Sequence, residues 1–404
     1  MSFFAPPPPP KSKLGNYRKF CTLAGVHVSP IILGGMSIGD KWGDYGMGAM
    51  NKEDSFKLLD AYYDLGGNFI DTANFYQEGS SEQFIGEWAE AKGIREQLFI
   101  ATKYSANPRA RDPSVEQKVL YGGTNAKSMH NSLTQSLKNL RTDYIDLFYV
   151  HWWDYDTTIE ELMQALHCTC HCSQSSLPRT CISQVLSLSH KLTYHFPSVE
   201  QGISDAPAWV VAQANQYARD HALTPFCVYQ GLWNVLDRSI ERDIIPMARQ
   251  WGMALAPWSV LAAGKIRTDE EEERRIKSGE QGRQVFGPWL RNDKEKAVCK
   301  VLEKIAGEIG AKSISSIAIA YVMHKARFVF PIIGGRKVDH LVANLEALDL
   351  SLSDEHIKEI EAAVPFDPGF PHNMIGDGTA HVGLHKQSGH LEFWPLPAPI
   401  TGKK

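Results

Sequence analysis

Four polar side chains in the first half of the chain follow strand-like runs and together could reduce a carbonyl group. Asp71 ends the run GGNFID, Tyr76 follows five residues later, Lys103 ends LFIATK and His151 ends YIDLFYVH. A phenol with an unperturbed pKa of about 10 is a weak acid, but a neighbouring ammonium lowers its pKa by favouring the phenolate. Tyr76 and Lys103 could therefore deliver a proton to an alkoxide, with Asp71 holding Lys103 and His151 orienting the carbonyl.

Each of these residues also has a purely structural interpretation. Asp71 could cap a loop, Tyr76 could pack as a loop aromatic, and His151 could be a structural residue before two tryptophans. Lys103 at the end of a buried strand is harder to explain in this way, because a buried charge is costly unless it is paired. Their occurrence on three consecutive strands favours the chemical interpretation.

The elements that would position these side chains alternate between short apolar strands and segments of helical periodicity. Ionisable residues at the ends of parallel strands are typical of a (β/α)8 TIM barrel, in which the active site lies at the carboxyl ends of the strands. Eight strand–helix units can be counted. Apart from strand five, the expected strands are Pro30–Gly35, Phe69–Asp71, Leu98–Thr102, Ile145–Val150, Val228–Gln230, Met253–Trp258 and Val329–Ile333.

The chain is expected to form one elaborated domain. Its 404 residues exceed the roughly 250 that are typical of one barrel, which tolerates insertions. Residues 1–19 are expected to be a proline-rich disordered arm, residues 20–365 the barrel, and residues 366–404 an irregular tail. A hairpin over Phe20–Val28 would plug the barrel floor, and Ser353–Ala363 would add an extra helix. Residues 264–293 are expected to be a long charged loop.

The slightly acidic composition argues against binding to polyanions and excludes few other classes of partner. The net charge is -4 and the pI about 6.4, so no nucleic acid is expected as a partner. No apolar run reaches the roughly 18 residues needed to span a bilayer, and the N-terminus lacks the features of a signal peptide. We therefore expect a cytoplasmic protein with no membrane contact. No metal site is assigned, and the oligomeric state stays open.

Residues 168–198 do not fit the pattern around them. Four of the seven cysteines lie here, where helix four should end and strand five should begin, and at most Glu200–Ser204 would recover strand pairing. Three interpretations compete: a surface insertion, translated non-coding sequence that replaces the original segment, and a metal site. The metal set would be Cys168, Cys170, His171, Cys172 and Cys181, whose spacing fits no ordinary zinc pattern well.

The tetrad carries a resemblance to a known family. GGNFIDTANFY resembles the strand-two signature of the aldo-keto reductase superfamily, with its catalytic Asp and Tyr at Asp71 and Tyr76, its Lys at Lys103 and its His at His151. Within the superfamily, GMALAPWSVLAAGK and VYQGLWNVLDR are similar to fungal aryl-alcohol dehydrogenases and norsolorinic acid reductases. The resemblance implies a catalyst that reduces aryl aldehydes or ketones to alcohols, reversibly, with NADPH/NADP+ bound without a Rossmann fold.

The resemblance also implies a set of cofactor-binding residues. GISD matches the motif after strand five, although Asp205 replaces the more general Asn and loses its donor. Arg at a ribose 2′-phosphate would favour NADPH through bidentate bonds; a solvated helix start is the structural alternative. The implied residues are Asp71, Ser204, Asp205, Gln230, Trp258, Ser259, Leu261, Lys265, Arg336, Lys337, His340 and Asn344.

Three tryptophans and the tail are candidates for an aromatic substrate pocket. Trp42, Trp152 and Trp153 could line it or pack in the core or at the rim, and the tail at Phe370–His372 could close it. Two other functions stay open. Disruption of strand five would favour a non-catalytic or impaired barrel. A glycosidase would use an acidic pair such as Asp154 and Asp156, but it gives Lys103 and Tyr76 no role.

Overall fold

The computed structural model describes residues 4–170, 198–279 and 288–402. Eight parallel strands form one sheet in the order β10-β3-β4-β5-β6-β7-β8-β9. The sheet closes because the backbone of Leu255 in β9 bonds Phe328 and Phe330, just before β10. The strands are β3 (Ile32–Gly34), β4 (Phe69–Asp71), β5 (Phe99–Tyr104), β6 (Ile145–Val150), β7 (Ser198–Ser204), β8 (Val228–Leu232), β9 (Ala254–Trp258) and β10 (Ile332–Ile333).

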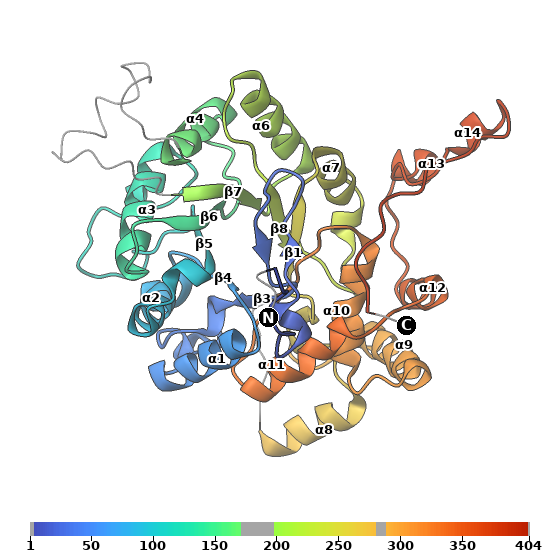
Figure 1. The fold of residues 1–404 in the computed structure, drawn as a ribbon, viewed down its shortest axis with the longest axis horizontal. Helices are drawn as coiled ribbons and strands as arrows, with labels where there is room; N and C mark the ends of the chain where they lie inside the picture. The colour runs from blue at the N-terminus through green and yellow to red at the C-terminus, as the bar shows by residue number, and fades with distance from the viewer. Residues whose placement is uncertain (1–3, 171–197, 280–287, 403–404) are drawn as a thin grey trace.

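Helices surround the strands and confirm the (β/α)8 barrel (Figure 1). Several begin at residues whose side chains cap the first turn, as Asn51 and Asn125 do, because the first amides of a helix lack partners within it. The helices of this layer are α1 (Lys52–Asp64), α2 (Ser80–Lys92), α3 (Ala126–Asn139), α4 (Ile159–Cys170), α6 (Ala208–Asp220), α7 (Ile244–Trp251), α9 (Asp293–Ile309), α10 (Ile314–Lys325), α11 (Val338–Asn344) and α12 (Asp354–Ala363).

The expected hairpin plugs the floor of the barrel. Strands β1 (Arg18–Lys19) and β2 (His27–Val28) pair antiparallel and lie across the strands in Figure 1. Phe20 is fully buried, and its ring centroid lies 5.7 Å from those of Phe69 and Phe99 and 5.3 Å from that of Phe330. Such tilted and edge-to-face contacts suit aromatic quadrupoles, so the floor is an apolar cluster.

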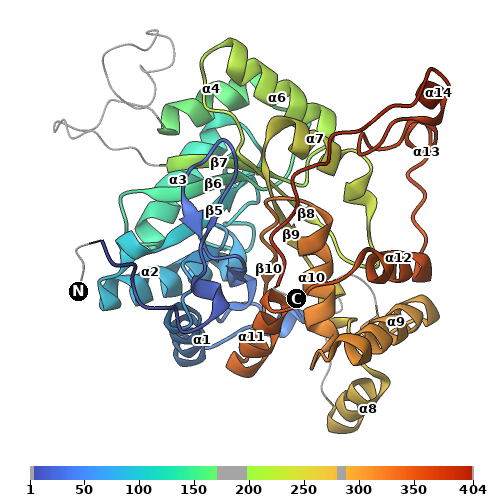
Figure 2. The ribbon, with the colours of Figure 1, turned by 45° about the vertical axis from the view of Figure 1, so that its right-hand side comes forward.

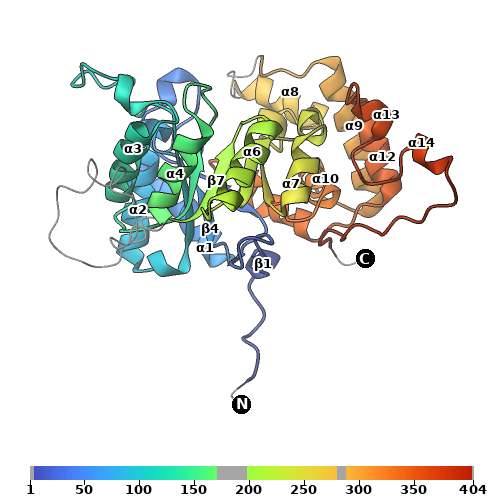
Figure 3. The same cartoon turned by 90° about the horizontal axis from the view of Figure 1, so that it is seen from above.

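Part of the expected N-terminal arm packs on the barrel. Ser12 Oγ donates to the Leu65 carbonyl at 2.7 Å, Lys13 pairs with Asp349 at 2.6 Å, and Leu14 is fully buried. The chain that precedes this segment extends away from the body of the protein below β1 (Figure 3). A boundary at residue 20 is therefore too late, because burial of Leu14 anchors the segment that precedes the hairpin.

Strand five is present, which corrects the expectation that the anomalous segment disrupts it. β7 begins at Ser198 and pairs with β6 from Ile145 onward, and its end pairs with β8, where Ser204 lies opposite Gln230. Backbone pairing with two neighbouring strands does not require apolar side chains, so the polar run SVEQ still forms a strand. Residues 171–197 lie outside the described residues, and with them most of the anomalous segment.

The two ends of that segment meet in space. Thr169 in α4 and Ser198 in β7 lie with their hydroxyl oxygens 3.1 Å apart. The last described turn of α4 and the first residue of β7 are therefore neighbours in space. The argument for an impaired barrel was the loss of strand five. That argument no longer holds, because β7 pairs with both β6 and β8.

The charged loop after β9 contains a helix that the sequence analysis did not expect. Helix α8 (Asp269–Ser278) begins with four acidic residues after the cap Thr268 and carries basic residues in its last turn, which suits the helix dipole. Glu272 accepts from both Arg267 and Arg291, at 2.9 Å and 3.0 Å from their Nε atoms. This buried cluster joins the beginning of the loop at Arg267 to its end at Arg291.

The C-terminal tail runs over the outside of the helical layer. Helices α13 (His372–Ile375) and α14 (Gly383–Lys386) lie outside the helical layer, beyond α7 and α12 on the right-hand side of the view (Figure 2). Arg242 Nε donates to the Pro368 carbonyl at 2.6 Å and His372 Nε2 lies 2.8 Å from Asp243. Within the described ranges no single helix is long and apolar enough to cross a bilayer, although α9 and α10, bent by 90° at their junction, would qualify as a pair.

Candidate active site

A buried ion pair forms the centre of the site. Lys103 is fully buried at the end of β5, and its Nζ donates to Asp71 Oδ1 at 2.5 Å and to the Thr72 carbonyl at 2.7 Å. Parallel pairing of β4 with β5 brings the carboxyl ends of both strands to the same edge. Burial opposes the positive charge of Lys103, but Asp71 and Tyr76 favour it more strongly and raise its pKa. Lys103 is therefore an ammonium at neutral pH.

Tyr76 lies over this ion pair, in the short 3-10 helix η4 (Tyr76–Gly79) that follows β4. The Lys103 ammonium lies 5.0 Å from the centroid of the Tyr76 ring. Burial raises the pKa of Tyr76, and Lys103 only partly offsets this effect. The expectation of a lowered pKa is thus wrong for the net value, because removal of water outweighs the neighbouring charge. The phenol is fully protonated at neutral pH, and Lys103 still favours the phenolate that it would leave.

His151 follows β6 and lies edge-on to Tyr76. The two ring centroids are 5.8 Å apart at 77°, and the His151 amide is held by the Tyr104 carbonyl at 3.0 Å. Burial, reinforced by the charge of Lys103, puts the pKa of His151 well below its usual value, so the imidazole is neutral. Its Nδ1 is buried without a hydrogen-bond partner among the described residues.

Gln230 ties the far side of the barrel to this centre. Its Nε2 donates to Asp71 Oδ2 at 2.9 Å, so the two oxygens of that carboxylate are held by two different strands. The buried Tyr149 ring also faces Lys103, with the ammonium 5.7 Å from its centroid. The sequence analysis missed Tyr149 and the Thr72 carbonyl. Thr72 stands directly after Asp71 in the motif, whereas Tyr149 gave no signal beyond an apolar strand.

The ends of β7 and β9 add a carboxylate and an indole. Asp205, directly after Ser204, has a positive φ of 44° and reaches solvent, and its Oδ1 accepts from Trp258 Nε1 at 3.2 Å. The protein around Asp205 withdraws water from the charge and raises the pKa of the carboxyl to about 6. Gln230, Asp205 and Trp258 thus lie on three successive strands at the same end of the barrel.

The loop after β9 contains three residues expected to bind the cofactor, and one of them, Lys265, is held by other protein groups. Ser259 has a φ of 54° and its Oγ accepts from the Ala263 amide at 3.2 Å, so the turn that contains Leu261 closes on itself. Lys265, however, is engaged by the protein, since its Nζ donates to the Leu290 carbonyl at 2.6 Å and to Glu295 at 3.1 Å. The sequence could not show this pair, because its members are 30 residues apart.

A second basic group lies beside α11. Arg336 and Lys337 precede this helix and are exposed, and within residues 4–170, 198–279 and 288–402 neither side chain forms a hydrogen bond or an ion pair. A side chain built on Gly48 would lie 3.8 Å from Arg336, so the loop after β3 faces the guanidinium. His340 is exposed on the same helix, and Asn344 is buried at its end.

Comparison with known proteins agrees with this geometry. The sequence profile of the aldo/keto reductase family matches residues 30–169 and 200–365. The chain belongs to the aldo/keto reductase family. The family match stops between residues 169 and 200, which is the segment that the sequence analysis set apart.

Three relatives of this aldo/keto reductase illustrate its branch. The chain is 54% identical over 408 aligned residues to an aryl-alcohol dehydrogenase (NADP(+)) of Phanerodontia chrysosporium, with all of both chains covered. It is 47% identical to a putative aryl-alcohol dehydrogenase of Saccharomyces cerevisiae, over 93% of this chain and 94% of the relative. It is 43% identical to norsolorinic acid reductase B of Dothistroma septosporum, over 95% and 94%.

Aromatic side chains line one side of the reductase tetrad. Trp42 is buried, and its ring centroid lies 5.3 Å from that of Phe75 and 6.2 Å from that of Tyr76. Trp153 packs in the core and Trp152 is partly exposed. Phe370 is 79% exposed, and His372 lies 2.8 Å from Asp243, just before α7. That this part of the tail closes the pocket stays a prediction.

The acidic pair expected of a glycosidase serves the backbone instead. Asp154 Oδ2 accepts from the Thr124 amide at 2.6 Å, and its Oδ1 accepts from the amides of Asp156 and Thr157 at 3.0 and 3.1 Å. These bonds lower the pKa of Asp154 and join the loops after β5 and β6. Asp154 is thus a structural cap.

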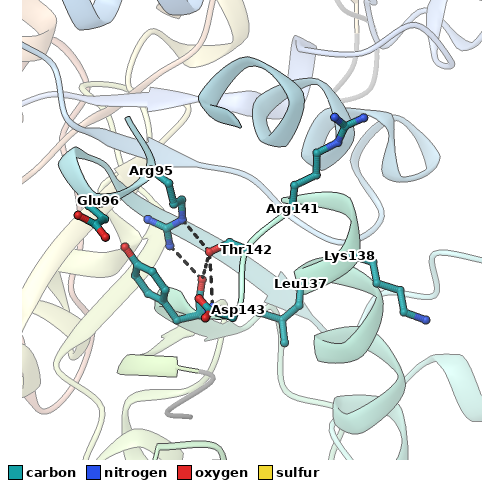
Figure 4. A pocket seen from close by; sticks show the side chains of 8 residues that line it. Arg95, Glu96, Leu137, Lys138, Arg141, Thr142 and Asp143 are labelled. Atoms are coloured by element: carbon teal, nitrogen blue, oxygen red, sulfur yellow. Dashed lines mark hydrogen bonds between the residues drawn. The ribbon is translucent and has the colours of Figure 1, made fainter. Parts of the chain in front are cut away.

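A hollow at the other end of the barrel is unrelated to the tetrad. Arg95, Arg141 and Asp143 are among its lining residues, which precede β5 and β6 (Figure 4). Arg95 is occupied by Asp146 at 2.7 Å, and Arg141 by Glu90 at 2.5 Å. Three members of the possible metal set, His171, Cys172 and Cys181, lie outside the described residues. Among those described, no group of three His, Cys, Asp or Glu side chains is placed to hold a metal ion.

Proposed function

We propose that this protein catalyses the NADPH-dependent reduction of aryl aldehydes or ketones to alcohols, and the reverse oxidation. The observation that carries the proposal is the fully buried Lys103–Asp71 pair beneath Tyr76, with neutral His151 beside it. A buried ion pair contributes little to the stability of a fold. Its presence at the ends of the strands is therefore better explained by a role in catalysis. NADPH, when bound, supplies the hydride.

In this proposal Tyr76 donates the proton from its Oη to the carbonyl oxygen as that oxygen becomes an alkoxide. Its raised pKa keeps the phenol protonated, and the Lys103 ammonium stabilises the phenolate that remains. Asp71 holds Lys103 in place. His151, neutral because of burial and Lys103, orients the carbonyl through a ring N–H. General acid catalysis of this kind contributes roughly 10² to 10⁴ in rate.

The chain offers groups that fit the cofactor. The exposed and unpaired Arg336 and Lys337 suit a ribose phosphate, since guanidinium binds phosphate in a bidentate manner. Trp258 presents an aromatic face at the end of β9 for the nicotinamide, near Ser204 and Gln230. Ser259, Leu261, His340 and Asn344 would complete the cofactor site. Lys265 would take part only by leaving Glu295.

The aromatic substrate class is supported by the wall of the site. Trp42 and Phe75 place apolar ring surface next to Tyr76 and exclude water from it, which suits an aryl group beside the reacting carbonyl. The relatives named aryl-alcohol dehydrogenases agree with this assignment.

Consumption of NADPH with a series of aromatic and aliphatic aldehydes tests the proposal. We expect aromatic aldehydes to be reduced with the higher kcat/KM, and NADH to be a poorer donor than NADPH. Tight binding of NADPH without turnover of any aldehyde would instead identify a non-catalytic barrel. Equal kcat/KM for aromatic and aliphatic aldehydes would contradict the role given to Trp42 and Phe75.

A further inference from the structure

The carboxylates of Asp71 and Asp205 lie at the same end of the barrel but differ in their partners. Asp71 is neutralised by Lys103 at 2.5 Å. Asp205 receives the neutral indole N–H of Trp258 at 3.2 Å, and no Lys, Arg or His within the described ranges forms an ion pair with it. The mouth of the site therefore contains a negative charge that is not compensated by a direct cation.

The backbone fixes this charge in place. Asp205 follows the last residue of β7, its amide donates to the Gln230 carbonyl at 3.1 Å, and its φ of 44° belongs to the left-handed region, which is uncommon outside glycine, Asn and Asp. The bond to Trp258 then ties the carboxylate to the edge of the aromatic face that would receive the nicotinamide. A fixed charge acts on a neighbouring ring without the cost of ordering a flexible side chain.

We propose, on the basis of the proposed function, that Asp205 sets the relative affinity of the site for oxidised and reduced cofactor, favouring NADP+. The nicotinamide ring carries a positive charge in NADP+ and none in NADPH. An ionised Asp205 therefore attracts one form and is nearly indifferent to the other. An Asn at this position has a similar shape but no charge, so the ratio of NADP+ affinity to NADPH affinity should be higher with Asp205 than with Asn.

The same charge makes this preference depend on pH. The surrounding protein withdraws water from the carboxylate and raises the pKa of Asp205 to about 6, while the hydrogen bonds from Trp258 and Ser204 and the charge of Lys103 oppose the rise. Asp205 also faces Tyr76 and Tyr229, whose pKa values are raised, so neither titrates near pH 6. His151 is neutral in this range because its pKa is lowered. Above about pH 6 the ionised carboxylate favours NADP+, and below it protonation removes the preference.

Calorimetric titration with NADP+ and with NADPH, without substrate, tests the proposal. Asp205→Asn should weaken NADP+ binding by about tenfold, as expected for a charge a few ångströms away in a partly solvated site, and should leave NADPH within about twofold. Asp220→Asn, at the far end of α6, removes the same net charge and should change neither.

The outcomes separate this proposal from the proposed function. If the unmutated protein binds neither cofactor, both are overturned. If it binds both, and Asp205→Asn weakens them equally or changes neither, the proposal is overturned and the proposed function stands. A ratio of affinities in the unmutated protein that does not change between pH 5 and pH 7.5, chosen to bracket a pKa of about 6, would also overturn it.

Discussion

The two ends of the barrel are built from the same strands but bury opposite kinds of side chain. The floor buries Phe20, Phe69 and Phe99 in contact with one another, whereas the carboxyl end buries Lys103 and Asp71. Apolar burial contributes directly to stability. A buried ion pair contributes little, because desolvation offsets its attraction. The comparison indicates that the floor holds the barrel together and the carboxyl end is kept for chemistry.

Removal of the Lys103 charge should have the largest effect, because it should lower both stability and activity. Lys103→Met leaves Asp71 buried and unpaired, so we expect the free energy of unfolding to fall by about 3–5 kcal/mol and reduction to fall by roughly 10² to 10⁴. Chemical denaturation and NADPH consumption measure the two effects. The double variant Lys103→Met with Asp71→Asn should recover stability but not activity; recovery of both would remove the pair from the chemistry.

The floor should respond in the opposite way. Phe20→Ala removes a fully buried ring, so we expect the free energy of unfolding to fall by about 3–5 kcal/mol, while kcat/KM of the folded fraction stays unchanged. Thermal melts and assays well below the melting temperature check this. Lys19→Ala, on the exposed side of the same hairpin, is the matched control. A specific loss of activity in Phe20→Ala would show that the floor and the site are coupled.

The basic residues before α11 should affect the binding of one cofactor only. Arg336→Ala should weaken NADPH binding by about 1.5–3 kcal/mol, the contribution of a hydrogen bond to a charged group, and should leave NADH nearly unchanged because NADH lacks the phosphate. Fluorescence titration with both cofactors provides the measurement. Lys312→Ala, which removes a positive charge from the turn between α9 and α10, controls for net charge. Equal affinities in the unmutated protein would contradict the assignment.

The anomalous segment should have the smallest effect. Thr169 and Ser198 are in contact, so a short glycine–serine linker can replace residues 171–197 without moving β7. Closing a shorter loop costs less entropy, so we expect the free energy of unfolding to rise by roughly 1–2 kcal/mol with unchanged kcat/KM. Denaturant titration of both chains decides this, and a chain with the same residues in scrambled order should behave like the original. Loss of activity in the shortened chain would give the segment a function.

The sequence predicted the parts of the fold that depend on local pattern. β4 and β6 have the expected bounds because short apolar runs end at Asp71 and His151. β7 was not predicted in full, since its polar residues are held by backbone pairing with strands far away in the sequence. Helix α8 was overlooked because a run of acids was interpreted as a solvated loop, although its first-turn acids and the cap Thr268 were visible.

In the site, too, the sequence predicted the residues of local motifs and missed the properties that depend on long-range contacts. The sequence placed Asp71, Tyr76, Lys103 and His151 on neighbouring strands, and the structure brings all four together. It could not show that burial outweighs Lys103 in setting the pKa of Tyr76, because burial is a property of the whole fold. The partner of Lys265, Glu295, depends on the long loop after β9 and was likewise beyond a local pattern.

Single-turnover reduction of an aromatic aldehyde by the Tyr76→Phe variant tests the central claim most directly. The phenol is the proposed proton donor and contributes little to cofactor affinity, so we expect the rate to fall by roughly 10² to 10⁴ while the Kd for NADPH and the melting temperature stay close to those of the unmutated protein. A rate within a few-fold of the unmutated protein would contradict the role of Tyr76 as the acid, and with it the account of the carboxyl end of the barrel.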